Sequence, residues 1–340
     1  KGKILVTGGA GYIGSHTVVE LIDNNYEVVV VDNLTNSYEF VIDRINTLTN
    51  STVKFENVDV CNEIELKRVF IENSDILGII HFAALKAVGE SVIQPLKYYN
   101  NNVVGLLNLL NVCDLNKVNN LVFSSSCTVY GQPDVLPVTE LSPRIRPESP
   151  YGNTKKIAEE IIEDFSATSD FKAILLRYFN PIGAHPTSLL GELPIGIPNN
   201  LVPVVTQTAA GLREKVTIYG NDYPTADGTC IRDYIDVIDL AKAHVIAIDR
   251  LLNKKRIAKV EAFNLGTGRG FSVLEIIETF QKVSGVVLNW AYGNRREGDI
   301  VQIFAETTKA ETELHWKATT HLSEMLLNSW NWQKKLSNIN

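Results

Sequence analysis

The sequence is poor in the residues that crosslink chains, bind metals or cross membranes. Its 340 residues include only four cysteines, and no two of them are separated by two residues. A CxxC redox or zinc motif is therefore excluded, and we expect free thiols, buried or half-buried, in a reducing compartment. No apolar run approaches ~18 residues, the length that spans a bilayer. The six histidines have no metal-ligand spacing, so we predict no metal site.

Positive charge and a secretory signal are also missing. Residues 1–7 read KGKILVT, without the apolar core of about 7–15 residues that a signal peptide has, so we expect a cytoplasmic protein. The 32 Lys and Arg residues are outnumbered by 39 Asp and Glu residues, which gives a net charge of −7. This balance argues against nucleic acid or an anionic membrane as partner, but it leaves room for a local cationic pocket that binds a phosphate ligand.

Apolar material is plentiful: 45% of the residues are hydrophobic and 21% are charged, as in ordinary globular proteins. The first half alternates β-branched runs with helical patterns, which predicts parallel βαβ units with right-handed crossovers. The continuous apolar run at 28–31 fits a sheet covered on both faces. The predicted fold class is α/β, a Rossmann-type doubly wound parallel sheet with a second, smaller α/β substrate lobe. The expected strands are 3–7, 27–31, 53–58, 76–82, 119–125 and 171–178, and the expected helices are 12–24, 63–73, 95–116 and 150–168.

The character of the chain changes after about residue 180. Five prolines fall within residues 181–203, which predicts an irregular segment rich in turns. We expect a first domain at 1–180 and a second lobe at 181–340, with part of 228–255 returning to the first domain. Short elements expected in the second lobe are 231–237, 238–252, 262–265 and 272–283.

A glycine-rich turn follows the first expected strand and precedes a helix. Gly8, Gly11 and Gly14 form a GxxGxxG pattern, in which glycines permit a tight turn, close backbone approach to a pyrophosphate and close helix–strand contact. The helix N-terminus then offers free N–H groups to phosphates. The second strand ends in Asp32, whose carboxylate can accept hydrogen bonds from both ribose hydroxyls of NAD. The alternative for Asp32 is a plain turn residue.

The ends of the next strands provide further cofactor candidates. Asp59 and Val60 end the third strand and are expected to flank the adenine, although Asp59 is equally well placed to cap a helix that begins near Glu63. The small residues after the fourth strand allow backbone to run beside the cofactor. Lys86 follows them and is a candidate for a phosphate or ribose contact.

Tyr151 and Lys155 stand four residues apart, directly after Pro150, a residue that favours a helix start. This spacing places both side chains on one helix face. A tyrosine titrates near pH ~10 in water, and a nearby ammonium together with a positive nicotinamide ring lowers that pKa. Tyr151 is then suited to take a proton from an alcohol while hydride leaves the same carbon.

A serine cluster lies at the carboxyl end of the fifth expected strand, the edge where open parallel sheets bind ligands. Ser126 is expected to hydrogen-bond the reacting oxygen, and a helix cap or turn is the alternative for the cluster. Cys127 follows, but no histidine is close to it in sequence. We interpret Cys127 as a small packing residue.

Eight motifs stand in order along the chain: TGGAGYIG, Asp32-Asn33, HFAALKAVGES, SSSCTVYG, SPYGNTK, RYFNPIGAHP, GIPNNLVP and RREGD. Together they resemble a family of sugar-nucleotide enzymes, the UDP-glucose 4-epimerases of the extended short-chain dehydrogenases/reductases. The resemblance covers nearly the whole chain. It implies an isomerase of galactose metabolism that interconverts UDP-galactose and UDP-glucose with tightly bound NAD, through a transient 4-keto sugar.

The resemblance also implies a role for each catalytic candidate. Tyr151 would remove the 4′-hydroxyl proton, Ser126 would share the hydrogen bond to the 4′-oxygen, and Lys155 would bond the nicotinamide ribose. Tyr178 is expected near the nicotinamide. The full set of expected cofactor contacts is Gly8, Gly11, Tyr12, Ile13, Gly14, Asp32, Asn33, Asn36, Ser37, Asp59, Val60, Phe82, Ala83, Ala84, Lys86, Asn101, Ser124, Tyr151, Lys155 and Tyr178.

The second lobe would hold the UDP group. Arg232 and Arg295 are candidates for the diphosphate, because guanidinium forks match phosphate oxygens and stay charged. Asp299 fits a uridine ribose contact and Tyr219 a packing contact with uracil, whereas Arg296 is interpreted as solvated. The expected substrate contacts are Lys86, Ser126, Tyr151, Asn180, Asn199, Asn200, Leu201, Tyr219, Arg232, Arg295, Asp299 and Ile303.

Two positions depart from the family pattern. Ile303 stands where members have Tyr or Cys, a position that gates the sugar pocket, so an epimerase acting also or mainly on UDP-N-acetylglucosamine and UDP-N-acetylgalactosamine stays open. Asp236 replaces the usual His of a YIHV segment, and the sequence offers no account of it.

Two other functions are open from sequence. A sugar-nucleotide dehydratase or decarboxylase is one, although a dehydratase needs an acid/base pair after Thr128, where this chain has Val129 and Tyr130. A non-catalytic UDP-sugar or NAD sensor is the other. The resemblance also implies a homodimer, formed through the helices expected at 95–116 and 150–168.

Overall fold

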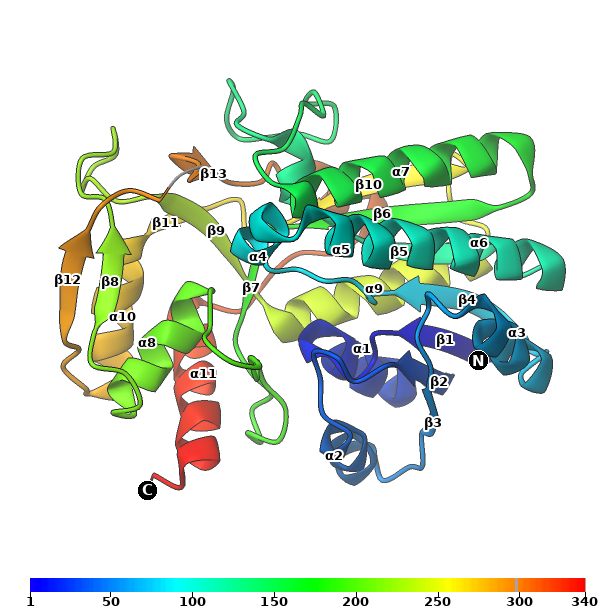
Figure 1. Cartoon of the computed structure of the whole chain (residues 1–340), viewed down its shortest axis with the longest axis horizontal. Coiled ribbons are helices and arrows are strands. Elements are labelled where there is room, and N and C mark those ends of the chain that lie inside the picture. The colour runs from blue at the N-terminus through cyan, green and yellow to red at the C-terminus, as the bar shows by residue number, and fades with distance from the viewer. Residues whose placement is uncertain (297–298, 340) are drawn as a thin grey trace.

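Seven parallel strands form the larger sheet of this computed structural model, which describes residues 1–296 and 299–339 (Figure 1). The strand order is β10-β6-β5-β4-β1-β2-β3, a doubly wound order with one strand added beyond β6. The predicted fold class is confirmed. The strands are β1 (Lys3–Thr7), β2 (Glu27–Asp32), β3 (Lys54–Asn57), β4 (Ile76–His81), β5 (Asn120–Ser126), β6 (Lys172–Tyr178) and β10 (Val260–Leu265).

Helices cover both faces of this sheet. One face is covered by α1 (Tyr12–Asp23), α2 (Phe40–Thr49) and α9 (Val237–Leu252), and the other by α3 (Glu63–Glu72), α6 (Gly105–Asn116) and α7 (Pro150–Thr168). Short helical segments complete this half: α4 (Val88–Ile93), α5 (Pro95–Tyr99), the π-helical η1 (Asn100–Val104) and the 3₁₀ turn η2 (Cys127–Tyr130).

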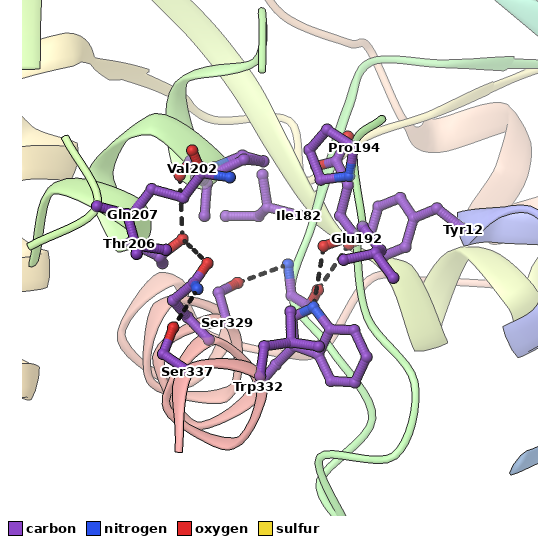
Figure 2. A pocket seen from close by; sticks show the side chains of 16 residues that line it. Tyr12, Ile182, Glu192, Pro194, Val202, Thr206, Gln207, Ser329, Trp332 and Ser337 are labelled. Atoms are coloured by element: carbon purple, nitrogen blue, oxygen red, sulfur yellow. Dashed lines mark hydrogen bonds between the residues drawn. The ribbon is translucent and has the colours of Figure 1, made fainter. Parts of the chain in front are cut away.

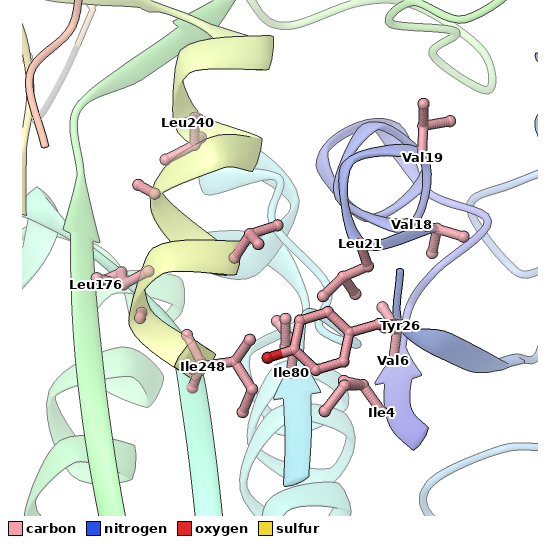
Figure 3. Packing of buried hydrophobic residues seen from close by; sticks show 14 of the residues in the cluster. Ile4, Val6, Val18, Val19, Leu21, Tyr26, Ile80, Leu176, Leu240 and Ile248 are labelled. Carbon is pink, nitrogen blue, oxygen red and sulfur yellow. The ribbon is translucent and has the colours of Figure 1, made fainter. Parts of the chain in front are cut away.

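The apolar run of β1 packs on both faces, because successive side chains of a strand point to opposite sides. Ile4 and Val6 join the cluster that Figure 3 shows, in which Leu21 of α1 and Ile248 of α9 meet over the sheet. Leu5 belongs to the cluster under α3, α6 and α7. Ile248 is fully buried, so its truncation to Ala would cost about 2–5 kcal/mol of stability.

Most predicted elements of the first half are confirmed, with ends that differ by one or two residues. The helix expected at 95–116 is interrupted by the π-helical turn Asn100–Val104. Helix α2 was not predicted, because only Ile42 and Ile45 of its residues are buried. One assignment was wrong: 262–265 belongs to β10, which pairs in parallel with β6 rather than lying in the second lobe.

The second lobe is built around β9, which pairs with β7, β11 and β13. Strands β8 and β12 form a separate parallel pair. An apolar cluster that includes Ile276 and Trp330 joins its three helices. The elements are β7 (Asn180–Ile182), α8 (Leu201–Ala209), β8 (Val216–Tyr219), β9 (Ile231–Asp236), β11 (Gly270–Ser272), α10 (Val273–Ser284), β12 (Trp290–Gly293), β13 (Gln302–Ile303) and α11 (Leu322–Ser337). The π-helical turn η3 (Ala310–Leu314) packs instead in the cluster over the larger sheet.

Helix α9 joins the two parts directly, since it begins where β9 of the second lobe ends and then packs on the larger sheet.

All four cysteines are free thiols, as expected. Within the described ranges, no helix combines the length and the apolar character that crossing a bilayer requires.

Candidate active site

The turn between β1 and α1 leaves no room for side chains. Gly8 has a φ of +70°, and a Cβ there would lie 2.7 Å from the backbone nitrogen of Ala83. A Cβ on Gly14 would lie 2.2 Å from the carbonyl oxygen of Gly8. Gly11 caps α1 without a side-chain hydrogen bond, so the first N–H groups of the helix, which begins at Tyr12 and Ile13, are available to an anion. These residues fit the pyrophosphate of a dinucleotide.

Asp32 ties the next turn to the glycine turn. Its Oδ1 accepts hydrogen bonds from Leu34 N at 2.9 Å and Ser37 Oγ at 2.8 Å, and its Oδ2 accepts one from Ala10 N at 3.1 Å. Asp32 is therefore a turn residue, as the alternative had it. A carboxylate oxygen has two acceptor sites, so Oδ2 retains one. The turn role is therefore compatible with a hydrogen bond from one ribose hydroxyl rather than from both. Asn36 is exposed in the same turn.

The end of β3 lies beside this turn. Asn33 Nδ2 donates to Asp59 Oδ2 at 3.0 Å, and Cys61 N donates to Asp59 Oδ1 at 2.8 Å. Helix α3 is capped by Asn62, whose side chain accepts a hydrogen bond from Glu65 N. The helix-cap alternative for Asp59 is therefore wrong.

After β4 the chain runs directly beside the glycine turn. Strand β4 ends at His81, one residue earlier than expected, and Phe82 N then donates to Thr7 O at 2.9 Å. Lys86 Nζ lies 3.1 Å from Glu192 Oε1 of the second lobe. Four further predicted contacts surround this stretch: Ala83, Ala84 and Asn101 are half-buried, and Val60 is buried.

Tyr151, Lys155 and the serines of β5 meet at the carboxyl edge of the sheet. Ser149 caps α7 by accepting a hydrogen bond from Gly152 N at 3.2 Å, which orients the helix start that carries Tyr151. Lys155 is 4% exposed, and its Nζ donates to Ser124 O at 2.6 Å. Ser126 acts on Tyr151 at this edge, since the serine side chain lowers the pKa of the tyrosine hydroxyl.

Ser126 also has the structural role that the sequence left open. Its Oγ accepts a hydrogen bond from Thr128 N at 3.2 Å and caps the 3₁₀ turn η2. Cys127 lies in a buried cluster with Val129 and Phe179, and burial raises the pKa of its thiol to about 12. The interpretation of Cys127 as a packing residue is confirmed.

Without a cofactor, the pKa of Tyr151 lies above the ordinary value of a tyrosine, not below it as expected. Burial raises the pKa of Tyr151 to about 12, and the hydrogen bond to Ser126 only opposes this effect. Burial also lowers the pKa of Lys155 to about 7, against the attraction of Glu159. Both shifts follow from the exclusion of water, which disfavours the charged form of each group. The prediction also counted the positive nicotinamide ring, so for the protein with NAD bound it stays a prediction, in which the added charge has to outweigh the desolvation of both side chains.

Tyr178 closes the first-lobe side of this site at the end of β6. It is 6% exposed, and its hydroxyl lies 3.4 Å from Nε2 of His244 on α9. Burial raises its pKa well above the ordinary value. Tyr178 is therefore a neutral phenol that lines the site rather than a base.

Two glutamates belong to this region, and the sequence did not single them out. Glu192 accepts from Lys86 and from Asn200 Nδ2, at 3.1 and 2.8 Å, and so joins the two lobes. Glu159 lies under the serine cluster, where its Oε1 accepts from Ser125 Oγ at 2.5 Å. Its position four residues after Lys155 was a usable signal, whereas nothing local marked Glu192.

The predicted substrate residues of the second lobe lie at strand ends and loops. Arg295 Nε donates to Asp222 Oδ1 at 2.7 Å, and the Arg296 guanidinium lies 3.8 Å from the centroid of the Tyr219 ring. Arg296 is exposed, yet it stacks on a predicted ligand contact rather than standing free in water. Glu297 and Gly298 of the RREGD motif lie outside the described residues. Further along, Asp299 and Asn180 are half-buried, as is Leu201 at the start of α8, and Asn199 is exposed.

Ile303 connects this lobe to the catalytic serines. It is 2% exposed on β13, opposite Arg232 of β9 in the parallel register. It packs in the same cluster as Cys127 and Phe179, the neighbours of Ser126 and Asn180. A side chain at 303 therefore borders the space next to Ser126.

Asp236, the second departure, has a structural explanation. It caps α9, with Oδ1 accepting from Ile238 N at 2.8 Å and from Asp239 N at 3.3 Å. Its Oδ2 is buried without a hydrogen-bond partner among the described residues, and a Cβ on Gly183 would lie 2.5 Å from it. Burial raises the pKa of Asp236 to about 6.

A cavity of about 260 Å³ lies between α8, α11 and the loop after β7 (Figure 2). Tyr12 and Glu192 form part of its wall, and Trp332 Nε1 donates to the carbonyl oxygen of Glu192 at 2.9 Å. Neither Ser126, Tyr151 nor Lys155 lines it. The cavity is thus separate from the catalytic cluster.

Comparison with known proteins agrees with this arrangement. A family model described as GDP-mannose 4,6 dehydratase matches residues 5–328. UDP-glucose 4-epimerase of Dictyostelium discoideum is 51% identical over 97% of this chain and 95% of that protein. This chain belongs to the UDP-glucose 4-epimerase family.

Solved structures of this family match the whole fold. The UDP-glucose-4-epimerase from Stenotrophomonas maltophila, with bound NAD and formylated UDP-arabinopyranose, superposes with a TM-score of 0.96 at 44% identity, covering 100% of both chains. The enzyme from Bifidobacterium longum, in complex with NAD+ and UDP, gives 0.94 at 47% identity, covering 99% of this chain and 100% of that one. The epimerase family assignment is thus carried by sequence and by structure.

Proposed function

We propose that this protein is an isomerase that interconverts UDP-galactose and UDP-glucose by inverting C4 of the sugar with NAD as cofactor. The observation that carries the proposal is the meeting of Ser126, Tyr151 and Lys155 at the sheet edge, beside a glycine turn that fits a dinucleotide. The relatives that resemble it are named for this activity, and two of their structures hold NAD.

NAD, held by the glycine turn and Asp32, would supply the hydride acceptor and donor that oxidation at C4 to a transient 4-keto sugar and reduction from the opposite face need. Tyr151 takes the 4′-hydroxyl proton and gives it back, and Ser126 orients the oxygen by a hydrogen bond. Lys155, held by Ser124 O at 2.6 Å, bonds the nicotinamide ribose and stabilises the phenolate of Tyr151 by its charge. Ser126 and Lys155 are buried and Tyr151 is half-buried, so bulk water is largely excluded, which protects the reactive keto sugar.

The second lobe recognises the UDP group. Arg295 and Arg232 bind the diphosphate, Tyr219 packs on the uracil, and Asp299 bonds the uridine ribose. The exposed guanidinium of Arg295 and the half-buried one of Arg232 suit a ligand that arrives with two negative charges. Accordingly, the cofactor domain is 1–180 and the substrate domain 181–340, apart from the α9–β10 return to the first sheet. That return extends the expected 228–255 segment to Leu265.

A dehydratase is the weaker candidate, even though the matching family model carries that description. The position after Thr128 holds Val129, which is fully buried, and Tyr130, whose hydroxyl donates to Asn264 Oδ1 at 2.6 Å. Burial raises the pKa of Tyr130 to about 12. The acid/base pair that elimination of water needs is therefore replaced by structural residues.

Conversion of UDP-galactose to UDP-glucose by the purified, NAD-loaded protein tests the proposed function. We expect turnover in both directions with no net consumption of NAD, because the hydride returns to the sugar. Failure to interconvert the two sugars would refute the proposal, and release of a 4-keto-6-deoxy sugar would favour the dehydratase.

We also propose a homodimer that pairs the helices expected at 95–116 and 150–168, with the short helix α4 beside them. Support comes from apolar side chains on this surface: Ile93 is 79% exposed, Leu96 81% and Leu107 42%, more than a single chain normally leaves in water. Light scattering at micromolar concentration should give twice the mass of one chain, and a monomeric mass would contradict the dimer.

A cytoplasmic location is proposed as well, supported by the four free thiols.

A further inference from the structure

Helix α7 carries three polar residues at intervals of four, Tyr151, Lys155 and Glu159, and therefore on one face. Each of them meets one of three consecutive serines at the end of β5. Tyr151 interacts with Ser126, Lys155 Nζ donates to Ser124 O at 2.6 Å, and Glu159 Oε1 accepts from Ser125 Oγ at 2.5 Å. The proposed function uses the first two of these contacts and leaves the third, Ser125 with Glu159, without a role.

Glu159 is a buried carboxylate whose two oxygens accept several hydrogen bonds, unlike the exposed carboxylates of the helix. It is 0% exposed, and its oxygens accept from Arg177 Nε at 2.8 Å, Arg177 Nη2 at 2.7 Å and Arg144 Nη1 at 3.0 Å. Burial opposes its charge, but the hydrogen bonds from Arg177, Ser125 and Arg144 outweigh burial and hold its pKa below the usual value. Glu159 is therefore an ionised anchor with its position set from several sides.

The anchor extends across neighbouring strands. Arg177 of β6 donates through Nη1 to the Tyr130 hydroxyl at 2.9 Å, and Tyr130 donates to Asn264 Oδ1 of β10 at 2.6 Å. Strands β6 and β10, helix α7 and the turn after β5 thus share one buried polar network. Networks of this kind rigidify a site when every member is satisfied.

We propose that the Ser125–Glu159 pair is a positioning device for catalysis, which fixes the end of β5 against α7 so that Ser126 and Tyr151 keep their reactive geometry. The inference rests on the proposed epimerase function. Lys155 also ties this end of β5 to α7 through Ser124 O, but Lys155 and Ser126 have roles in the reaction. The Ser125–Glu159 contact is the link made by side chains that the reaction leaves unused. A displacement of about 1 Å between reacting groups costs roughly 100-fold in rate.

Ser125→Ala is the direct test, because it removes one hydroxyl and leaves the Glu159–Arg177 pair intact. We expect kcat for UDP-galactose to fall between about 10- and 100-fold, with KM within about twofold and NAD content unchanged. Ser125→Thr keeps the hydroxyl and should restore most of kcat. The matched control is Ser166→Ala on the same helix, a buried serine whose Oγ has no hydrogen-bond partner among the described residues; it should retain wild-type kcat.

The rates are normalised to bound NAD, so that loss of folded protein does not count as loss of kcat. A wild-type kcat in Ser125→Ala would overturn the inference, and so would an equal loss in Ser166→Ala. A loss that Ser125→Thr fails to restore would assign the pair a merely structural role and overturn it as well. Absence of turnover in the wild-type protein would instead refute the proposed function, so the two failures are distinguishable.

Discussion

The two halves of the proposed site differ in how their polar groups are held. In the first lobe Lys155 is 4% exposed and Ser126 is 8% exposed, and both make hydrogen bonds to neighbouring backbone. In the second lobe Tyr219 is 38% exposed and the side chain of Arg295 is 45% exposed. In the proposed function, the chemistry is thus preorganised in a buried network, whereas recognition of UDP depends on more exposed side chains.

The ion pairs show the same contrast. Glu159 and Arg177 are almost completely buried, so breaking this pair would leave an uncompensated charge in the core at a cost of about 3–5 kcal/mol. Arg295 and Asp222 form an exposed pair, which water screens and which therefore contributes little to stability. A diphosphate can therefore take Arg295 from Asp222 at little cost. The difference teaches that the first lobe is built to hold geometry and the second to exchange partners.

The largest expected effect is that of Tyr151→Phe, which removes the acid/base hydroxyl from the rigid half. We expect kcat to fall by about 10²–10⁴-fold while NAD and UDP-sugar binding persist. The measurement is steady-state epimerisation with bound NAD quantified for each variant. Tyr292→Phe, an exposed tyrosine on β12, is the control and should keep wild-type activity. A non-catalytic sensor or scaffold would show no epimerisation in the wild type, and Tyr151→Phe would leave its response to NAD or UDP-sugar unchanged.

Arg295→Ala tests the second lobe, whose exposed side chains are proposed to exchange an internal partner for the diphosphate. Loss of charged hydrogen bonds worth about 1.5–3 kcal/mol should raise KM by roughly 10- to 100-fold and change kcat little. The matched control is Arg68→Ala, because Arg68 is a similarly exposed arginine, 40%, that also pairs with carboxylates. Its KM should stay at the wild-type value. If Arg295→Ala lowered kcat and left KM unchanged, the division between geometry and recognition would be wrong.

The next largest effect concerns the stability of the first lobe in acid. Burial lowers the pKa of His16 and of His244 to about 4 and of His81 to about 3, and all three pack against the larger sheet. The unfolded chain takes up protons near pH 6.5 while the folded chain does not, so stability is lost as the pH falls below that value. Each buried histidine should cost about 2 kcal/mol of unfolding free energy between pH 7 and pH 5.

His16→Gln isolates one of these contributions. Urea unfolding at pH 7 and pH 5 should show a stability loss about 2 kcal/mol smaller in the variant than in the wild type. His321→Gln is the control, since His321 is exposed at the start of α11 and water solvates its ring in both states. Equal losses in wild type and His16→Gln would contradict burial of a neutral ring.

The smallest effect is a change of selectivity at Ile303. Because Ile303 is buried next to the cluster of Cys127 and Phe179, a larger Tyr should narrow the space beside Ser126. Ile303→Tyr should lower kcat/KM for UDP-N-acetylgalactosamine about tenfold, which corresponds to roughly 1.4 kcal/mol. Turnover of UDP-galactose should change less than threefold. Equal loss on both substrates would mean that position 303 acts on packing and not on selectivity.

Much of the fold and of the proposed site could be predicted, because their signals are local. The glycines of the first turn, Asp32 at the end of β2 and the Tyr151–Lys155 spacing all depend on a few adjacent residues whose backbone geometry follows from residue type. The strand β10 could not be assigned to the first sheet, since pairing with β6 joins residues about 90 positions apart and leaves no local periodicity. The role of Glu192 could not be predicted for the same reason, because its partners Lys86 and Asn200 come from different lobes.

The sequence by itself determined the chemistry that the chain carries and the order of its elements, because residue identity and short-range spacing set both. Only the tertiary structure decided which groups stay charged and which are held in place. Burial raises the pKa of Tyr151 and lowers that of Lys155, opposite to the effect expected from their attraction alone. The Ser125–Glu159 contact likewise exists only after β5 and α7 have packed, because desolvation and hydrogen-bond geometry depend on what surrounds a group and not on its neighbours along the chain.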